Sequence, residues 1–240
     1  MLACRRFALC VALLFPLLAQ AGELVILVDT ATEMPMARVE RFQLVDGMHR
    51  DVGVALAKAM GREPRFLVLP RMRIVGALEA GDADILCGYI PGWIKGGFAW
   101  SQPFLPHVEV IITNRSAKRP RSIADLAGRP IGTVFGFAYP DLERALGKRF
   151  VRADGPSSDI NLRKLSLGRL QRMVTIKDFV DYRLKMGDPE LSLHPQLVVN
   201  SHMTRCAVSP KGRVTLAEVD RAVAQIVREG AVAAITTRYK

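Results

Sequence analysis

The first half of the chain alternates between short apolar runs and stretches in which apolar residues recur every three or four positions. The runs ELVILVD, RFLVL and DILCGY have the length and composition of buried parallel strands. The stretches 51–61 and 74–81 have helical spacing, and each ends at a glycine that suits a helix C-terminus. Asp51 is the expected N-cap of the first helix. This pattern predicts a βαβαβ unit, which is typical of a doubly wound α/β sheet.

The second half repeats the alternation after a basic, proline-containing segment. Strands are expected at VEVIITN, RPIGTV, FVRA, RMVTI, QLVVN and RCAVSP, and helices at IADLAG, FGFAYPDLERALG, around 157–168, at KDFVDYRLKMG and LAEVDRAVAQIVREG. Two βα lobes with separate sheets leave a cleft between them, and ligands of open α/β sheets bind at the carboxyl ends of the strands. We therefore expect ligand contacts from the loops after DILCGY and after RPIGTV.

The N-terminal 21 residues have a different character. Arg5 and Arg6 precede the apolar run FALCVALLFPLL, and Ala19-Gln20-Ala21 places small residues before a cleavage point. The apolar run is well short of the ~20 residues that a membrane-spanning helix needs, which argues against an anchor. The segment is predicted to be a secretory signal peptide cleaved after Ala21, so the mature chain is expected in the periplasm.

The charge of the chain is strongly positive. The formal net charge is +11, and the residues after Ala21 keep +9 because the predicted signal peptide holds two arginines and no acidic residue. Such a balance favours anionic partners, among them acidic solutes, membrane surfaces and nucleic acids. The basic residues are spread along the chain without a nucleic-acid-binding motif, and export argues against a nucleic acid partner. A basic, solvated surface is the commoner explanation.

Removal of the signal peptide would leave two of the four cysteines, Cys87 and Cys206. In an oxidising compartment two cysteines favour one disulfide, whereas their apolar, strand-like surroundings suit two buried free thiols almost as well. Both alternatives stay open at this point. Two cysteines are too few for a metal site, and no histidine has ligand spacing, so no metal or other cofactor is predicted.

Several segments together resemble a known family. They are ELVILVDTATEMPM, DGMHRDVGVALAKAMG, LEAGDADILCGY, the Ser-x-Pro-aromatic element WSQPF, IADLAGRPIGTVFG, LSLGRLQRMVTI, CAVSPKG and AQIVREGAVAAI. Each segment alone is weak, but their order and spacing over nearly the whole mature chain are fairly specific. The chain resembles a divergent member of the type II periplasmic solute-binding proteins of ABC transporters, in the family-3 branch that binds polar amino acids.

This resemblance implies a two-lobed α/β venus flytrap, in which each lobe is a mostly parallel sheet flanked by helices. The first lobe would comprise residues 22–112 and 205–240 and the second residues 113–204, with crossings near Ile111–Asn114 and Met203–Ala207. The implied function is capture of a small solute, anionic or amino-acid-like, by a monomer that delivers it to the membrane permease of an ABC transporter.

An enzymatic function finds little support in the sequence. The chain has no G-x-S-x-G, no H-E-x-x-H and no phosphate-binding loop, so no catalytic residue is predicted. The same fold also hosts periplasmic dehydratases and sensor domains. A small-acid dehydratase or an accessory sensor protein therefore stays an alternative.

The chain departs from amino-acid-binding members of the family at the expected ligand site. Such members typically have an Arg shortly before the Ser-x-Pro element, which holds the ligand α-carboxylate through two hydrogen bonds. The corresponding segment PGWIKGGFAW has no Arg, and Lys95 is its nearest cation. The acidic residue expected in the second lobe matches Asp178 only after a shift in register. These departures argue against an ordinary α-amino acid as the ligand.

Eight residues are candidate ligand contacts. They are Met34 in the proline loop, Arg71 after RFLVL, Tyr89 at the end of DILCGY, Trp93 and Lys95 beyond it, and Gly136, Phe137 and Tyr139 ahead of a second-lobe helix. Trp93 is suited to stacking on a planar solute and Lys95 to pairing with an acidic group, and backbone N–H groups ahead of a helix attract anions. The ordinary alternatives are a cap on the lobe edge for Trp93, a solvated loop position for Lys95 and an exposed helix start for Arg71.

Overall fold

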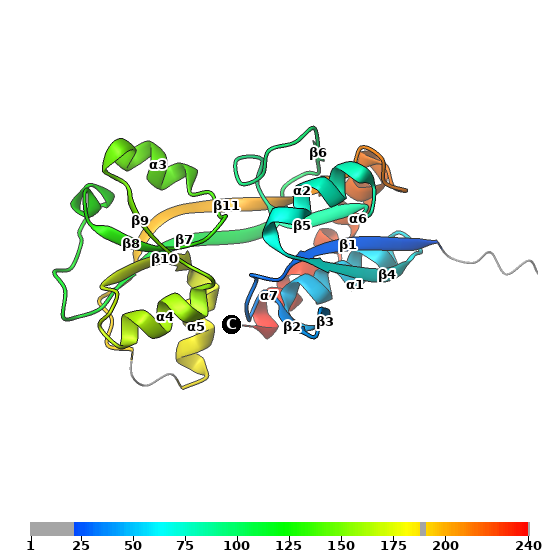
Figure 1. Ribbon diagram of the computed structural model, residues 1–240. Helices are drawn as coiled ribbons and strands as arrows, with labels where there is room; N and C mark the ends of the chain where they lie inside the picture. Colours follow the sequence, from blue (N-terminus) through cyan, green and yellow to red (C-terminus); the bar gives the residue numbers. More distant parts are fainter. Residues whose placement is uncertain (1–21, 188–190, 240) are drawn as a thin grey trace, which may run out of the picture.

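The computed structural model describes residues 22–187 and 191–239, and the predicted signal peptide lies outside the described residues. Helices and strands alternate through this part, as Figure 1 shows. The strands are β1 (Glu23–Asp29), β2 (Arg38–Glu40), β3 (Gln43–Asp46), β4 (Glu63–Leu69), β5 (Ile85–Tyr89), β6 (Ala99–Trp100), β7 (Leu105–Thr113), β8 (Pro130–Val134), β9 (Val151–Gly155), β10 (Arg172–Ile176) and β11 (Leu197–Val208). The helices are α1 (Met48–Ala59), α2 (Arg71–Ala80), α3 (Pro140–Leu146), α4 (Ser158–Ser166), α5 (Lys177–Lys185), α6 (Leu216–Arg228) and α7 (Ala231–Arg238), with short 3-10 helices η1 (Ile123–Leu126) and η2 (Gly147–Arg149). Among the described residues, no helix combines the length and apolar character needed to cross a membrane.

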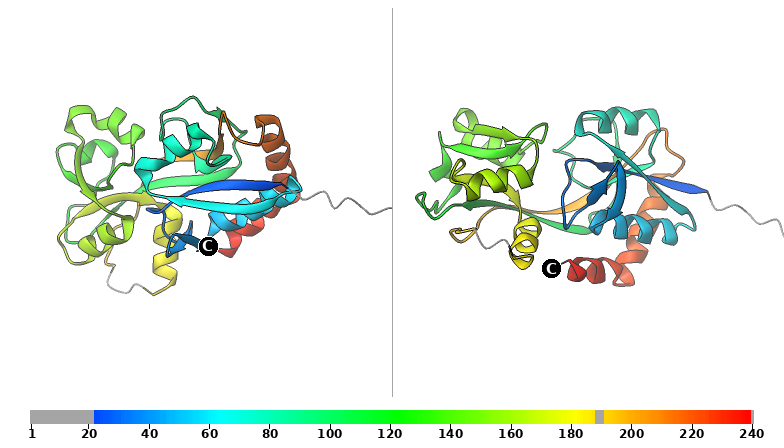
Figure 2. Two further views of the ribbon diagram at one scale, coloured as in Figure 1. Left: turned by 45° about the vertical axis from the view of Figure 1, so that its right-hand side comes forward. Right: turned by 60° about the horizontal axis from the view of Figure 1, so that its bottom comes forward.

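One sheet runs through the molecule in the strand order β4-β1-β5-β11-β7-β10-β8-β9, with β6 paired to β11. β1 is parallel to β4 and β5, and β8 is parallel to β9 and β10. The antiparallel strands β7 and β11 lie between these two parallel groups. Figures 1 and 2 show the resulting two lobes, with β7 and β11 running from one lobe into the other. The predicted two-lobed, mostly parallel α/β architecture is confirmed.

β7 and β11 form the crossings between the lobes. The two strands pair with each other. Residues 109–113 of β7 also pair with β10 in the second lobe, and residues 205–208 of β11 pair with β5 in the first lobe. The sequence predicted two strands, QLVVN and RCAVSP, where the structure has the single strand β11. Its middle, residues 200–203, alternates between exposed and half-buried positions, so it lacks the apolar run that marks a core strand. The predicted lobe boundaries fall at or within these strands and stay a prediction.

The first lobe buries both faces of its sheet. Along β1, Leu24 and Ile26 pack in one apolar cluster with α1, α6 and α7, whereas Val25 and Leu27 pack in another with α2. All four side chains are at most 3 % exposed. Because successive side chains of a strand point to opposite faces and both faces are covered here, the strand reads as a continuous apolar run.

The second lobe is layered in the same way. Val110 and Ile112 of β7 pack with α4 and α5, and Ile111 packs with α3 and η1 on the opposite face. Side chains two positions apart share a face of a strand, so His107 and Glu109 lie on the same side of β7 as Ile111. This register puts polar side chains where β7 crosses from one lobe to the other.

Cys87 of β5 and Cys206 of β11 form a disulfide. The two residues are register partners in neighbouring antiparallel strands, and their Cα atoms lie 3.9 Å apart. Of the two alternatives that the sequence left open, the structure has the disulfide. The bond ties the returning strand β11 to the first lobe.

Two helices begin earlier than the sequence predicted. α1 starts at Met48 with Gly47 as its N-cap, so the expected capping residue Asp51 lies in the first turn instead. α2 starts at Arg71, three residues before the expected start. The added turn of α2 carries exposed residues, which apolar periodicity does not reveal. The earlier start fixes Arg71 in a helical turn directly after β4.

Candidate functional site: a cavity between the lobes

A cavity lies between the two lobes, beside the crossing strand β7. It encloses about 830 Å³ of empty space, including its opening to solvent. Its wall combines residues of the first lobe, of β7 and of the second lobe, among them Glu33, Arg71, Trp93, Glu109, Phe137 and Tyr139. A molecule bound here would contact both lobes, which is the geometric condition for a domain closure driven by ligand.

Arg71 is held by its own lobe. Its guanidinium donates to the Tyr89 hydroxyl at 2.8 Å and to the Trp93 carbonyl at 2.9 Å, and it lies 3.7 Å from the Asp29 carboxylate. Asp29 is 1 % exposed, and burial raises the pKa of this carboxyl group although the Ala31 amide and the Arg71 charge oppose the shift. The cation therefore belongs to a buried ion pair, and little of its charge is left for an acidic solute.

Two contacts join the lobes across the cavity. The Arg71 guanidinium lies 4.8 Å from the ring centroid of Phe137 in the second lobe, within range of a cation–π interaction. The Glu33 carboxylate accepts a 2.8 Å hydrogen bond from the backbone N–H of Asp159 in the first turn of α4. Burial raises the pKa of Glu33, while the helix N-terminus favours its negative charge. The lobes thus touch directly through residues of the cavity wall.

β7 brings ionisable side chains to the cavity. Glu109 is 5 % exposed, and its Oε2 atom has no hydrogen-bond partner among the described residues. Burial, together with the charge of Asp141, raises the pKa of Glu109 to about 7. Burial, together with His202 and His49, lowers the pKa of His107 to about 3. The His107 imidazole is therefore neutral near pH 7, and the Glu109 carboxyl group is close to its midpoint.

Trp93 packs over this polar face of the crossing strands. Its ring centroid lies 4.7 Å from that of His107 and 5.9 Å from that of His202, in edge-on arrangements, and 6.0 Å from that of Tyr89. The buried indole Nε1 has no partner within residues 22–187 and 191–239. Trp93 thus contributes to the cavity wall while its indole N–H, a donor only, stays without a partner among these residues.

Solved structures share this fold, whereas no protein-family model and no curated protein sequence matches the chain. An ancestral arginine-binding protein bound to arginine aligns with a TM-score of 0.75 at 18 % identity, over 92 % of this chain and 99 % of that one. The ancestral amino-acid-binding protein AncCDT-1, a precursor of cyclohexadienyl dehydratase, aligns with a TM-score of 0.72 at 19 % identity, over 91 % and 95 %. A histidine kinase sensor domain with similarity to periplasmic binding proteins aligns with a TM-score of 0.76 at 19 % identity, over 92 % and 96 %. The chain has the type II periplasmic-binding-protein fold. The resemblance noted in the sequence is confirmed as a structural match at low identity.

In this periplasmic-binding-protein fold, five of the eight predicted contact residues line the cavity, namely Arg71, Tyr89, Trp93, Phe137 and Tyr139. Gly136 is exposed beside it, with the Arg71 side chain 3.4 Å from the position that a Cβ atom would take. Met34 packs against the first-lobe core, and Lys95 is exposed; neither is part of the cavity wall. The roles of all eight as ligand contacts stay predictions.

Four ionisable residues of the wall were absent from the predicted set, namely Glu33, His49, His107 and Glu109. The segment HVEV carried a usable signal, because polar residues at alternate positions of an apolar strand indicate one polar face. Glu33 carried none, because its partner Asp159 lies 126 positions away in the sequence.

Proposed function

We propose that the protein is a periplasmic receptor that captures a small, amino-acid-like solute between its lobes and presents the closed form to an ABC transporter permease. The observation that carries this proposal is the cavity walled by residues of both lobes. A ligand that contacts both lobes favours the closed over the open arrangement. The predicted signal peptide supports the periplasmic location, and a monomer is sufficient because one chain supplies the whole wall.

The lining favours a solute without excess negative charge. Arg71 is the only Arg or Lys among the described residues of the wall, and it is paired with Asp29. The half-buried Glu33 and the buried Glu109 add two acidic groups. Aromatic rings such as that of Trp93 suit planar or cationic groups. The anionic solute that the net charge suggested is thus disfavoured, and the structural neighbours include arginine-binding proteins.

A thermal-shift screen of the mature protein against amino acids, amines, organic acids and sugars tests the proposal. We expect a stabilising hit among amino-acid-like compounds, because a ligand at 100 times its Kd stabilises the folded state by about 2.7 kcal/mol. Small-angle scattering checks that the hit also compacts or fixes the two lobes. Silence across all four classes contradicts the proposal.

A pair of phenylalanine variants locates the binding of such a hit. Phe137→Ala removes a cavity ring and is expected to weaken the hit about tenfold, in keeping with about 1.4 kcal/mol for lost aromatic contact. Phe135→Ala is the matched control, because Phe135 lies two positions away and is 66 % exposed. Equal affinities of the two variants, measured by calorimetry, would place the solute elsewhere.

An enzyme of the same fold is the second candidate function. The observation that favours it is the placement of a carboxyl group and an imidazole, those of Glu109 and His107, in the wall of one cavity. Incubation of the hit compound with the protein separates the two functions. A receptor retains one unchanged molecule per chain, whereas an enzyme releases product that mass spectrometry detects.

A further inference from the structure

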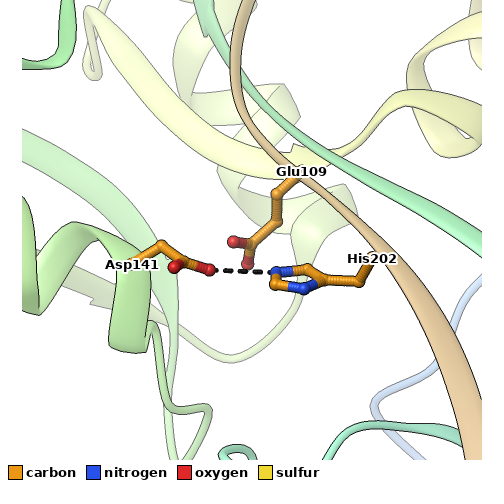
Figure 3. A group of neighbouring side chains, drawn as sticks. All are labelled: Glu109, Asp141 and His202. Carbon is orange, nitrogen blue, oxygen red and sulfur yellow. Dashed lines mark hydrogen bonds and ion pairs between the residues drawn. The ribbon is translucent and has the colours of Figure 1, made fainter.

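Three side chains from separate segments meet beside the cavity: Glu109 of β7, Asp141 of α3 and His202 of β11. One possible ligand atom of each lies within 4.8 Å of the others. Figure 3 shows the Glu109 carboxylate pointing into the gap between the Asp141 carboxylate and the His202 ring. Glu109 and His202 share one face of the crossing strands, because His202 is the register partner of His107.

The two carboxylates of this cluster differ in their partners. Asp141 lies 2.9 Å from His202 Nε2 and 3.1 Å from the Arg144 guanidinium. Glu109 is 5 % exposed, and its Oε2 atom has no partner among the described residues. A buried carboxylate is ordinarily paired with a cation or coordinates a metal. The described part of the chain supplies no such partner to Glu109 Oε2, so this oxygen is open to a group from outside the chain.

We propose that Glu109, Asp141 and His202 bind a divalent transition-metal ion, for which Zn²⁺ is the best-matched probe. Carboxylate oxygen and imidazole nitrogen both bind zinc at about 2.0–2.2 Å, whereas Mg²⁺ and Ca²⁺ favour oxygen-only sites. Two carboxylates balance the two charges of the ion. Coordination by His202 Nε2 replaces its contact with Asp141, and the neutral imidazole then carries its one proton on Nδ1.

The ion would sit at the cavity wall. Three protein ligands leave one position of a tetrahedral zinc ion open, and Glu109 itself lines the cavity. Water or a donor atom of a bound molecule would take this fourth position. Metal binding goes beyond solute capture and does not depend on it, because the ion can be titrated without any solute.

The test uses the mature protein after treatment with a chelator and gel filtration. Calorimetric titration with ZnCl₂, joined by elemental analysis after a second gel filtration, is expected to give one zinc per chain and a higher Tm. MnCl₂ serves as a second probe of the same donor set. His202→Gln and Glu109→Gln are each expected to weaken zinc binding at least about tenfold, the scale of effects seen even for outer residues of metal sites.

His194→Gln is the matched control. His194 is another of the four histidines of the chain, and its Nε2 atom lies within hydrogen-bond distance of the Ala117 carbonyl rather than in this cluster. It is expected to keep the wild-type zinc affinity. Urea unfolding of every variant identifies any variant that no longer folds. If His202→Gln or Glu109→Gln fails to fold, the zinc affinity of the other variant tests the proposal. The proposal is overturned if the protein binds neither ion, or if both ligand variants bind zinc as the wild type does. Loss of zinc binding in His194→Gln to the same degree also overturns it.

The outcome is independent of the solute screen. Zinc binding without any solute hit would leave the metal site standing while the receptor function fails. A solute hit that Glu109→Gln binds with unchanged affinity, together with no uptake of either ion, would leave the receptor function standing while the metal site fails. A hit from the amine class that Glu109→Gln abolishes, without uptake of either ion, would assign the unpaired carboxylate to an organic cation and overturn the metal site.

Discussion

Two buried acidic groups lie at or behind the cavity wall, where Glu109 is a lining residue and Asp29 pairs with the lining residue Arg71; the structure accommodates the two in different ways. Asp29 is enclosed by its own lobe, with Arg71 at 3.7 Å and the Tyr89 hydroxyl at 3.4 Å. Glu109 lies on the crossing strand β7 with one carboxylate oxygen that has no partner among the described residues. Both side chains are at most 5 % exposed, so burial alone does not distinguish them.

This difference in pairing indicates a stabilising role for the Asp29 cluster (Asp29 with Arg71 and Tyr89). It indicates a binding role for the Glu109 cluster (Glu109 with Asp141 and His202). A buried charge with a partner from its own lobe is complete as folded, and removing the partner leaves an uncompensated charge. A buried charge without such a partner lowers stability until something binds to it. The Asp29 cluster is therefore expected to hold the first lobe together, and the Glu109 cluster to recruit a ligand.

The largest expected effect follows from removing the partner of Asp29. Arg71→Met leaves the carboxylate buried and unpaired, and is expected to lower the free energy of unfolding by about 3 kcal/mol in urea denaturation. Arg73→Met is the control, because Arg73 is an exposed position of the same helix, and is expected to stay within about 0.5 kcal/mol. The double variant Asp29→Asn/Arg71→Met should recover part of the loss. A loss in Arg71→Met no greater than in the control would remove the contrast between the clusters.

A pH series on His49, a third ionisable residue of the wall, tests whether the cavity excludes charge in general. Burial lowers the pKa of His49 from 6.5 to about 4, so the unfolded chain binds its proton first and stability falls as the pH drops from about 6.5 to about 4. Between pH 7.5 and 4.5, the free energy of unfolding of His49→Gln relative to wild type is expected to rise by about 2–3 kcal/mol. Urea denaturation at both pH values measures this double difference, in which other titrating groups largely cancel. A pH-independent difference would show that His49 titrates normally.

The smallest expected effect has the opposite sign to that of Arg71→Met. With metal removed by a chelator at pH 8, Glu109→Gln is expected to raise the free energy of unfolding by about 1 kcal/mol, because it removes a buried charge that has no partner. Asp141→Asn, which breaks contacts with His202 and Arg144, is expected to lower it. Chemical denaturation of both variants sharpens the comparison. Equal destabilisation by the two changes would mean that Glu109 is compensated in solution.

The elements of each lobe were predictable because their signal is local. The apolar run of β1 and the spacing in α6 reflect strand and helix periods that need no knowledge of distant residues. The errors occurred where local signal fades: the turn of α2 that begins at Arg71 is mostly exposed, and the middle of β11 lies between the lobes. Neither segment carries the apolar periodicity on which the predictions rested.

The candidate site was only half predictable. Tyr89 ends β5, and Trp93 and Phe137 follow strand ends, where open α/β sheets bind ligands. All three line the cavity. The partnership of Asp141 with His202 joins residues 61 positions apart, and that of Glu33 with Asp159 spans the two lobes. No spacing rule connects such residues, because their proximity depends on how the lobes pack around β7 and β11.

The sequence by itself determined the two α/β lobes, their order along the chain and the strand ends at which a cavity forms, because hydrophobic periodicity and turn residues act over a few positions. Only the tertiary structure decided which charges are paired. Arg71 is turned toward Asp29, Cys87 is bonded to Cys206, and Glu109 is buried with an unpartnered oxygen. The physical reason is that desolvation and pairing depend on the distances between side chains brought together by folding, and these distances are not written in the local pattern of the chain.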